Sequence, residues 1–379
     1  MAKIVWVLGA GFSRSLGGPL LTQLFSEKSQ LDVLTAFPSA DFSELFSPEA
    51  KLVRSVYAQH KAGRWQDAEE FLDYLDTARS KGPGTHAREV IRQLVVQTPY
   101  GSNWKDITVE TIDKMATASQ RLLAAECSAF LKDAEPTSER WAPYHRWAAE
   151  LAGEDTVITF NYDLVVEKLA NMTPELRAKL RFPLTGLGLE DQSRVRILKL
   201  HGSVNWCKEA TPVPDVFKLF VTDDEYFALR CPEQCLTIGT PGPTKFNATA
   251  GGVLEQVWNV AMDALSGADA IVLVGYRFPE SDSAARRLLV EAIGKNTKRQ
   301  LALHTVLGPS TESDASRRLE SILKTAANKK ARNWLASPPE QPIPYGPTDT
   351  RLWYSLTQWP LYAQDFLDLY ERDQLTSVA

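Results

Sequence analysis

Four short motifs in the chain hold side chains that could do chemistry, and the first is a glycine-rich turn. The segment Gly9–Ser13 reads GAGFS and directly follows the apolar run Ile4–Leu8. A strand that passes through such a turn into a helix brings backbone N–H groups to a helix N-terminus, where they stabilise a diphosphate. Arg14 stands where the G-x-G-x-x-G spacing requires its third glycine, which disfavours an ordinary dehydrogenase. The alternative is a tight strand-to-helix turn that binds no ligand.

The second motif, Thr159–Asp163, reads TFNYD and lies at the end of another apolar run. Ligands of open α/β sheets bind beyond such strand ends. Asn161 can donate and accept hydrogen bonds, and Asp163 can accept them from an amide or a ribose hydroxyl. On spacing alone, the simpler interpretation is that Asn161 caps a helix over residues 163–170.

The third motif, Leu200–Ser203, again follows an apolar run and contains His201. The glycine after this histidine leaves one face of the imidazole uncrowded, which suits a general base. For an isolated histidine, the simpler interpretation is a hydrogen-bonded structural role.

The fourth motif, Val274–Asp282, reads VGYRFPESD. Gly275 would let a ligand approach the strand end, and Tyr276 or Phe278 could cover a base or a ribose. The alternative is a strand-to-helix turn in which Pro279 opens the helix.

The elements that must position these motifs are strands buried on both faces. Continuous apolar runs bounded by turn residues are typical of parallel sheets, and helical patterns lie between them. The sequence therefore predicts an α/β class with a Rossmann-like parallel sheet flanked by helices. The runs are Ile4–Leu8, Val157–Phe160, Ile197–Leu200, Ile271–Val274 and Leu301–Leu307.

The first two runs are separated by about 150 residues, far more than one crossover helix needs. Helical spacing over residues 65–75 and 111–132 predicts a helical insertion at about 35–150 within a catalytic domain of residues 1–310. Residues 210–246 are rich in proline and glycine and are expected to form an irregular loop over the sheet.

The remaining residues, 311–379, are expected to form a helical C-terminal extension. A helical pattern over 313–330 is followed by a proline-rich link and an aromatic tail. Tryptophan and tyrosine are enriched at interfaces, so the tail is a candidate surface for assembly or for a partner. Packing of the tail onto the chain's own core is an equally good interpretation.

Composition excludes several classes of protein. The 379 residues carry a net charge of −5, which argues against a protein that mainly holds nucleic acid. No apolar stretch approaches the roughly 20 residues that cross a bilayer, and no signal peptide is evident, so a cytoplasmic location is expected. The four cysteines are too scattered for a disulfide framework, and no second close pair completes a tetrahedral metal site around Cys231 and Cys235.

Taken together, the four motifs resemble the sirtuin family. The resemblance spans roughly residues 3–307 and is carried by Gly9–Ser13 with Gly18 and Pro19 behind it, Asn161–Asp163, His201 with Gly202, and Gly275–Pro279. The closer resemblance is to the prokaryotic sirtuin-like branch of antiphage-defence systems, where an aromatic residue stands between the Asn and the Asp. The last motif of that branch reads Gly-Tyr-Ser-hydrophobic-Pro, so Arg277 departs from its usual serine.

This resemblance implies a Rossmann-like core that binds NAD as its substrate, with no metal. It makes Asn161 and His201 the catalytic pair, places Asp163 near the nicotinamide ribose or carboxamide, and places the Gly275 loop near the adenosine half. The residues expected to contact the dinucleotide are Gly9, Ala10, Gly11, Phe12, Ser13, Thr159, Asp163, Gly275, Tyr276 and Phe278.

The implied reaction is hydrolysis of NAD to nicotinamide and ADP-ribose, with depletion of NAD as the effector step of abortive infection. The chain lacks the paired cysteines of the zinc ribbon in protein-deacylating sirtuins, so deacylation is a second hypothesis, and a non-catalytic sensor of NAD or ADP-ribose is a third. Unregulated NAD hydrolysis would kill the host cell. Gating is therefore expected, through a homo-oligomer or a separately encoded ATPase, nuclease or other sensor.

Overall fold

The centre of the protein is a seven-stranded parallel sheet with the strand order β10-β9-β8-β1-β2-β4-β3. The computed structural model describes residues 2–65, 67–80, 86–100, 108–182, 194–211, 217–239, 254–279, 282–310, 313–336 and 353–376. The strands are β1 (Ile4–Leu8), β2 (Thr156–Thr159), β3 (Leu180–Arg181), β4 (Val195–Lys199), β8 (Ala270–Val274), β9 (Leu301–Val306) and β10 (Tyr354–Trp359). The predicted α/β, Rossmann-like class is confirmed.

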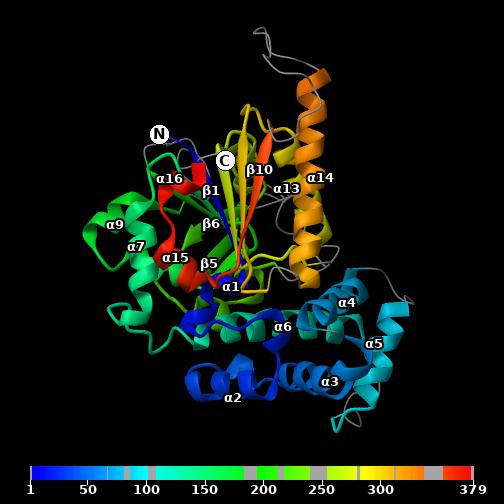
Figure 1. Cartoon of the computed structure of the whole chain (residues 1–379). Coiled ribbons are helices and arrows are strands. Elements are labelled where there is room, and N and C mark those ends of the chain that lie inside the picture. The colour runs from blue at the N-terminus through cyan, green and yellow to red at the C-terminus, as the bar shows by residue number, and fades with distance from the viewer. Residues whose placement is uncertain are drawn as a thin grey trace.

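Strand β1 shows why these runs are continuously apolar. All five of its residues are buried, and alternate side chains enter two different cores. Trp6 packs on one face with Trp147 and Phe366, whereas Val5 and Val7 join the core on the other face. Helices α12 (Glu255–Ser266), α13 (Ser283–Gly294) and α14 (Asp314–Ala336) cover the second face, while α7 (Ala142–Glu150) and α15 (Ala363–Leu369) cover the first (Figure 1).

The strand order defines where a ligand would bind. The chain builds β2 and β4 on one side of β1, then crosses to build β8, β9 and β10 on the other. In open α/β sheets ligands bind at the carboxyl ends of the strands where the order reverses, which in this sheet is between β1 and β8.

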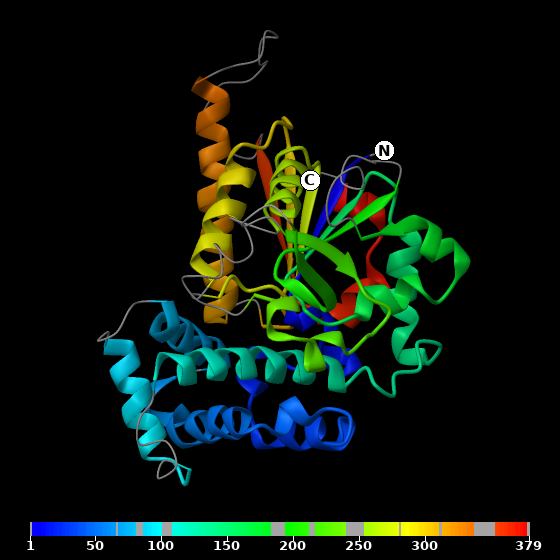
Figure 2. The ribbon, with the colours of Figure 1, turned by 180° about the vertical axis from the view of Figure 1, so that it is seen from behind.

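The predicted helical insertion lies between β1 and β2. Figures 1 and 2 show its long helices beyond the carboxyl ends of the sheet strands. Its helices are α2 (Glu27–Ala36), α3 (Pro48–Arg64), α4 (Ala68–Ser80), α5 (His86–Val96) and α6 (Val109–Ala129).

A buried carboxylate joins this insertion to the segment that follows the glycine turn. Glu126 of α6 is 4% exposed and accepts a hydrogen bond from the backbone N–H of Phe25 at 2.8 Å. Burial raises the pKa of Glu126 to about 7, while that hydrogen bond, a hydrogen bond from Ser29 and the charge of Arg54 act to lower it. Phe25 has a positive φ of 57°. Glu126 therefore helps to hold a backbone conformation that residues other than glycine rarely adopt.

Replacing Glu126 with glutamine should flatten the pH dependence of stability. The carboxyl has a pKa of about 7 when folded and an ordinary value of 4.5, so between these pH values the folded state binds more protons. The contribution of Glu126 to the free energy of unfolding is therefore largest at low pH. It declines by about 3 kcal/mol as the pH rises to about 7. Urea unfolding at pH 5 and pH 8 should show a smaller decline for Glu126→Gln than for wild type. Glu110→Gln, at an exposed position of the same helix, serves as control. An equal decline in the free energy of unfolding for wild type and Glu126→Gln would contradict the raised pKa of Glu126.

A second, antiparallel sheet follows β4, with the strand order β6-β5-β7. Its strands are β5 (Gly202–Ala210), β6 (Phe217–Val221) and β7 (Leu236–Ile238), and helix α10 (Phe227–Arg230) lies between the last two. The prediction of an irregular loop over residues 210–246 was therefore wrong for 217–239. Residues 212–216 and 240–246 lie outside the described part of the chain.

The C-terminal segment completes the core. Helix α14 agrees with the predicted helical extension, but β10 pairs in parallel with β9 over six residues, which the sequence did not predict. The aromatic tail packs on the chain's own sheet, where Phe366 and Tyr370 contact Trp6. Of the two interpretations of the tail, the structure therefore agrees with packing onto the chain's own core.

An ion pair fixes this tail to the start of the sheet. Asp155 is fully buried, accepts hydrogen bonds from the N–H groups of Ile4 and Ala152, and pairs with both terminal nitrogens of Arg372 at 2.5 and 2.8 Å. The Asp155 carboxylate raises the pKa of Arg372. A bidentate pair of this kind fixes orientation as well as charge.

Arg372→Ala should lower the free energy of unfolding by about 3 kcal/mol, because the buried Asp155 carboxylate loses its countercharge. Chemical denaturation measures this value. Arg317→Ala removes an arginine whose pair with Asp314 lies on the surface, with side chains 64% and 98% exposed, and should cost less than about 1 kcal/mol. Equal losses for the two variants would show that the Arg372 pair does not hold the tail.

Candidate active site at the carboxyl edge of the sheet

The glycine-rich turn leaves β1 at the centre of the sheet and enters α1 (Ala10–Ser13), a helix of one turn. Three of its amides donate to backbone carbonyls: Gly9 N–H to Val274 at 3.0 Å, Gly11 N–H to Gly275 at 3.2 Å, and Phe12 N–H to Gly9 at 2.8 Å. In this conformation those three donors are engaged. The diphosphate role of the turn stays a prediction that requires other donors or a rearrangement.

The glycines of this turn let two loops touch. A Cβ on Gly11 would lie 2.6 Å from the Cα of Gly275, and a Cβ on Gly9 would lie 2.7 Å from the Gly275 carbonyl oxygen. Gly275 itself has a φ of +67°. The predicted glycines are therefore required by close backbone approach at the switch point, whether or not a ligand binds there.

The other side chains of the turn face the protein interior. The Phe12 ring is buried edge-on against Tyr144 and Trp147, and Ala10 is half-buried. Ser13 is 1% exposed and its hydroxyl donates to Asp163 at 2.7 Å. Ser13 is thus a link between motifs here and not a free donor for a phosphate.

Asn161 joins the second motif to the first. Its side-chain amide donates to the Gly9 carbonyl and to the Ser13 hydroxyl, both at 3.1 Å. Its backbone N–H donates to the Thr159 hydroxyl at 3.1 Å. The interpretation of Asn161 as a helix cap was wrong, because α8 (Val165–Ala170) begins after Leu164 without a side-chain cap. Asp163 instead accepts a local hydrogen bond from the Val165 N–H at 3.1 Å.

Asp163 is buried. One of its carboxylate oxygens accepts a hydrogen bond from the Ser13 hydroxyl, and the other accepts one from the Val165 N–H. Burial raises its pKa, while the nearby Lys199 and these two hydrogen bonds act in the opposite direction. The carboxylate therefore holds the glycine turn against β2 in this conformation.

A buried cation that the sequence did not single out lies beneath these residues. Lys199, at the end of β4, is 1% exposed and donates to the Asp163 carbonyl at 2.6 Å and to Glu167 at 2.8 Å. Burial raises the pKa of Glu167, and Lys199 opposes that shift. A charge this deep needs such a partner. The signal available in sequence was a lysine at the end of an otherwise apolar run.

His201 lies against the two neighbours of Asn161. Its ring centroid is 4.8 Å from that of Phe160 and 6.1 Å from that of Tyr162, and Trp258 closes a third side at 6.5 Å. The histidine is 3% exposed. The structure thus places Asn161 and His201 at the ends of the adjacent strands β2 and β4, with the Asn161 amide on the glycine turn and the His201 ring among aromatic side chains.

Asp282 faces His201 across this cage. Its Oδ1 lies 3.7 Å from Nε2 of His201, and the Tyr276 hydroxyl donates to its Oδ2 at 3.4 Å. Asp282 is 4% exposed. The sequence placed Asp282 in the turn after β8 but gave no sign that this turn meets the loop after β4.

Tyr276 and Phe278 line the cage from the side of the β8 loop. Tyr276 stacks on Phe160 at 4.1 Å with an interplanar angle of 6°, and Phe278 packs on Tyr276 at 4.9 Å. Phe278 has a φ of 49°, and Arg318 donates to its carbonyl at 2.6 Å. Both rings are buried, so in this conformation they pack against Phe160 and each other and do not line an open groove.

The described residues include no group of three or more His, Cys, Asp or Glu side chains that could hold a metal ion. Within the same ranges, no helix is long and apolar enough to cross a membrane. In comparisons with known proteins, no family model and no curated protein matches the chain significantly. The chemistry of the site must therefore be argued from its residues.

Proposed function

We propose that the protein binds NAD at the carboxyl edge of its parallel sheet and hydrolyses the nicotinamide–ribose bond. The observation that carries this proposal is that His201, which follows β4, lies against the two rings that flank Asn161, which follows the adjacent strand β2. Asn161 would position the ribose or the attacking water, and His201 would act as the base. Positioning of this kind is a major source of rate in such reactions.

The closed state of the site supports the further proposal that activity is gated. His201 is 3% exposed and three amides of the glycine turn are engaged by backbone carbonyls. NAD cleavage would require the Gly275 loop to move away from the turn. We propose that assembly or a separately encoded defence partner favours that movement, so that NAD is depleted only on infection.

Asp282 is placed to orient His201 and to stabilise its protonated form. Asp282→Asn should lower kcat by a factor of about 10 to 100 and move the acidic limb of the pH–rate profile to lower pH, because the imidazolium loses its anionic neighbour. A purely structural Asp282 would change the rate without moving that limb, so an unmoved limb contradicts the orienting role. Asp314→Asn, an exposed aspartate on α14, is the control.

The proposed reaction is tested by nicotinamide release from NAD with and without an acetyl-lysine peptide, by the purified chain alone and with the products of adjacent genes. A hydrolase releases nicotinamide without the peptide. Release that requires the peptide would indicate a deacylase. NAD binding in a calorimeter without any release under these conditions would indicate a sensor and contradict the proposal.

A further inference from the structure

The backbone of the segment that follows β8 is strained. This segment, the Gly275 loop (residues 275–279), has a φ of 67° at Gly275 and of 49° at Phe278. Glycine adopts such angles readily, whereas phenylalanine rarely does. The Phe278 ring is nevertheless 1% exposed and packs on Tyr276. A strained conformation of this kind persists only where surrounding contacts hold it.

Arg318 of α14 supplies such a contact. Its guanidinium donates to the Phe278 carbonyl at 2.6 Å and to the Arg277 carbonyl at 3.4 Å. Hydrogen bonds from a charged donor are shorter and stronger than neutral ones, and the shorter of these two ends on the strained residue itself. Arg318 thereby ties the Gly275 loop to a helix that begins after the next strand of the sheet.

The same loop closes the candidate site at two points. The Gly275 carbonyl accepts from the Gly11 N–H at 3.2 Å, and a Cβ on Gly275 would lie 2.4 Å from the Cα of Gly11. Tyr276 stacks on Phe160, whose ring lies against His201. A diphosphate at the glycine turn would have to displace the loop, because backbone atoms this close leave no space for it.

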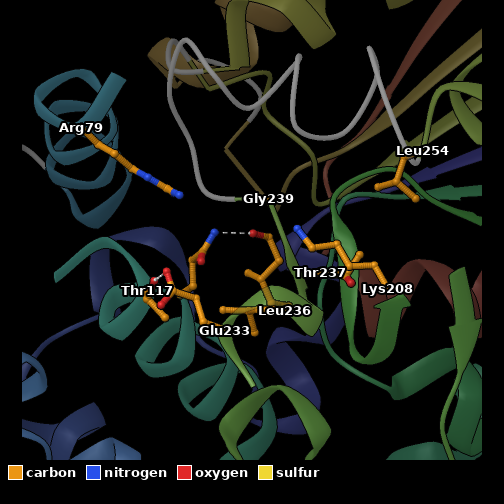
Figure 3. Close-up of a pocket in the computed structure, with 10 residues that line it drawn as sticks. Arg79, Thr117, Lys208, Glu233, Leu236, Thr237, Gly239 and Leu254 are labelled. Atoms are coloured by element: carbon orange, nitrogen blue, oxygen red, sulfur yellow. Dashed lines mark hydrogen bonds between the residues drawn. The ribbon is translucent and has the colours of Figure 1, made fainter. Parts of the chain in front are cut away.

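The side of His201 that faces the small sheet is held in a different way. Gly239, which follows β7, donates to the His201 carbonyl at 3.0 Å, and Gln120 of α6 donates to the Ile238 carbonyl at 2.8 Å. Figure 3 shows Gly239 at this junction, beside a cavity of about 140 Å³ between the insertion and the small sheet. Pockets for small-molecule ligands occupy roughly 300–1,000 Å³, so this cavity is too small for a dinucleotide. Of the two sides, the Gly275 loop is the one whose movement would free the glycine turn.

We infer that Arg318 acts as a latch, which keeps the candidate site closed through its hydrogen bonds to the Gly275 loop and opens the site when they are released. This inference names the regulation of the proposed NAD site and in that respect rests on the proposed function, but movement of the loop can be measured without NAD. The neighbouring Arg317 side chain is 64% exposed. A partner that contacts this part of α14 would therefore reach the latch.

Hydrogen exchange and chemical modification of the full chain test the latch. In Arg318→Gln, the amides of a peptide that covers residues 275–279 should exchange about tenfold faster than in wild type, because the loop loses its charge-assisted hydrogen bonds and opens more often. Diethylpyrocarbonate should modify His201, which is 3% exposed, faster by a similar factor. Arg318→Lys retains a cation with fewer donors and should lie between the two proteins.

Two kinds of control separate local opening from general destabilisation. Arg317→Gln removes the adjacent arginine of α14, which pairs with Asp314 on the surface, and should behave as wild type. Within each protein, the β8 peptide and the modification of His304, which is 2% exposed on β9, should be unchanged. Circular dichroism checks the folding of each variant, and Arg318→Lys carries the test if Arg318→Gln does not fold.

Two results would overturn the latch. The first is a folded Arg318 variant with wild-type exchange in the Gly275 loop and wild-type modification of His201. The second is equal acceleration in the β8 peptide and at His304, which would mean that Arg318 only supports the fold as a whole. Nicotinamide release from NAD separates this inference from the proposed function. An open loop in Arg318→Gln without any release supports the latch and contradicts NAD hydrolysis, whereas release by wild type with its partner and a closed loop in Arg318→Gln contradicts the latch alone.

Discussion

Asn161→Ala and His201→Ala are each expected to lower nicotinamide release from NAD by a factor of at least about 100. The two residues stand at the ends of adjacent strands, and the rings beside Asn161 contact His201. Loss of a positioned general base typically costs a factor of about 10² to 10⁴. Because the two side chains would act on the same ribose, the double variant should lose little more activity than either single variant. The rate of nicotinamide formation, followed by chromatography, measures this.

The controls separate chemistry from folding. Asn161 also donates two hydrogen bonds that link the motifs, so Asn161→Ala should cost about 1 to 2 kcal/mol of stability, which thermal unfolding will show. His145→Ala on α7 and Asn171→Ala after α8 replace the same residue types outside the site and should retain full activity. Folded Asn161→Ala and His201→Ala proteins with wild-type turnover would exclude both residues from catalysis.

Gly202→Ala is expected to destabilise the protein by more than about 4 kcal/mol. Gly202 directly follows His201 and has a φ of +85°, and a Cβ there would lie 1.8 Å from the carbonyl oxygen of Thr237. That atom belongs to the backbone of β7, which cannot move without breaking the pairing with β5. The clash and the strained φ act together. Urea unfolding of soluble protein, or its absence from the soluble fraction, measures the effect.

Gly267→Ala is the matched control. Its Cβ would meet only the Asp263 carbonyl oxygen, at an ordinary 3.6 Å, and its φ of −104° is open to any residue. This variant should fold within about 1 kcal/mol of wild type. A Gly202→Ala protein as stable as Gly267→Ala would mean that the loop after β4 does not have this conformation.

The parallel core could be predicted from sequence because its strands are buried on both faces. Strands β1, β2, β8 and β9 coincide with continuous apolar runs. Strand β10, with the sequence YSLTQW, is mostly half-buried at the sheet edge and has no such run. The small sheet was missed for a related reason, since its strands lie among prolines and glycines that indicated a loop.

The residues of the candidate site could be predicted from the sequence, but the contacts between them could not. Asn161, Asp163 and His201 were found because they follow strand ends. Their partners depended on side-chain geometry: Asn161 donates to the Gly9 carbonyl instead of capping α8, and Asp163 accepts from the Val165 N–H. Asp282 meets His201 only because β8 and β4 lie on opposite sides of the β1–β2 pair and their loops converge over it. The spacing of residues along the sequence does not predict the contact between Asp282 and His201.

The most direct test of the account is a single-turnover reaction with the wild-type chain in excess over NAD, with the candidate gating partners present, quenched and analysed for nicotinamide and ADP-ribose. Cleavage at the closed edge of the sheet should yield the two products in equal amounts until NAD is exhausted, and His201→Ala should yield neither on the same timescale. NAD that survives unchanged under every condition, or nicotinamide formed equally fast by His201→Ala, would contradict the central claim that this edge hydrolyses NAD.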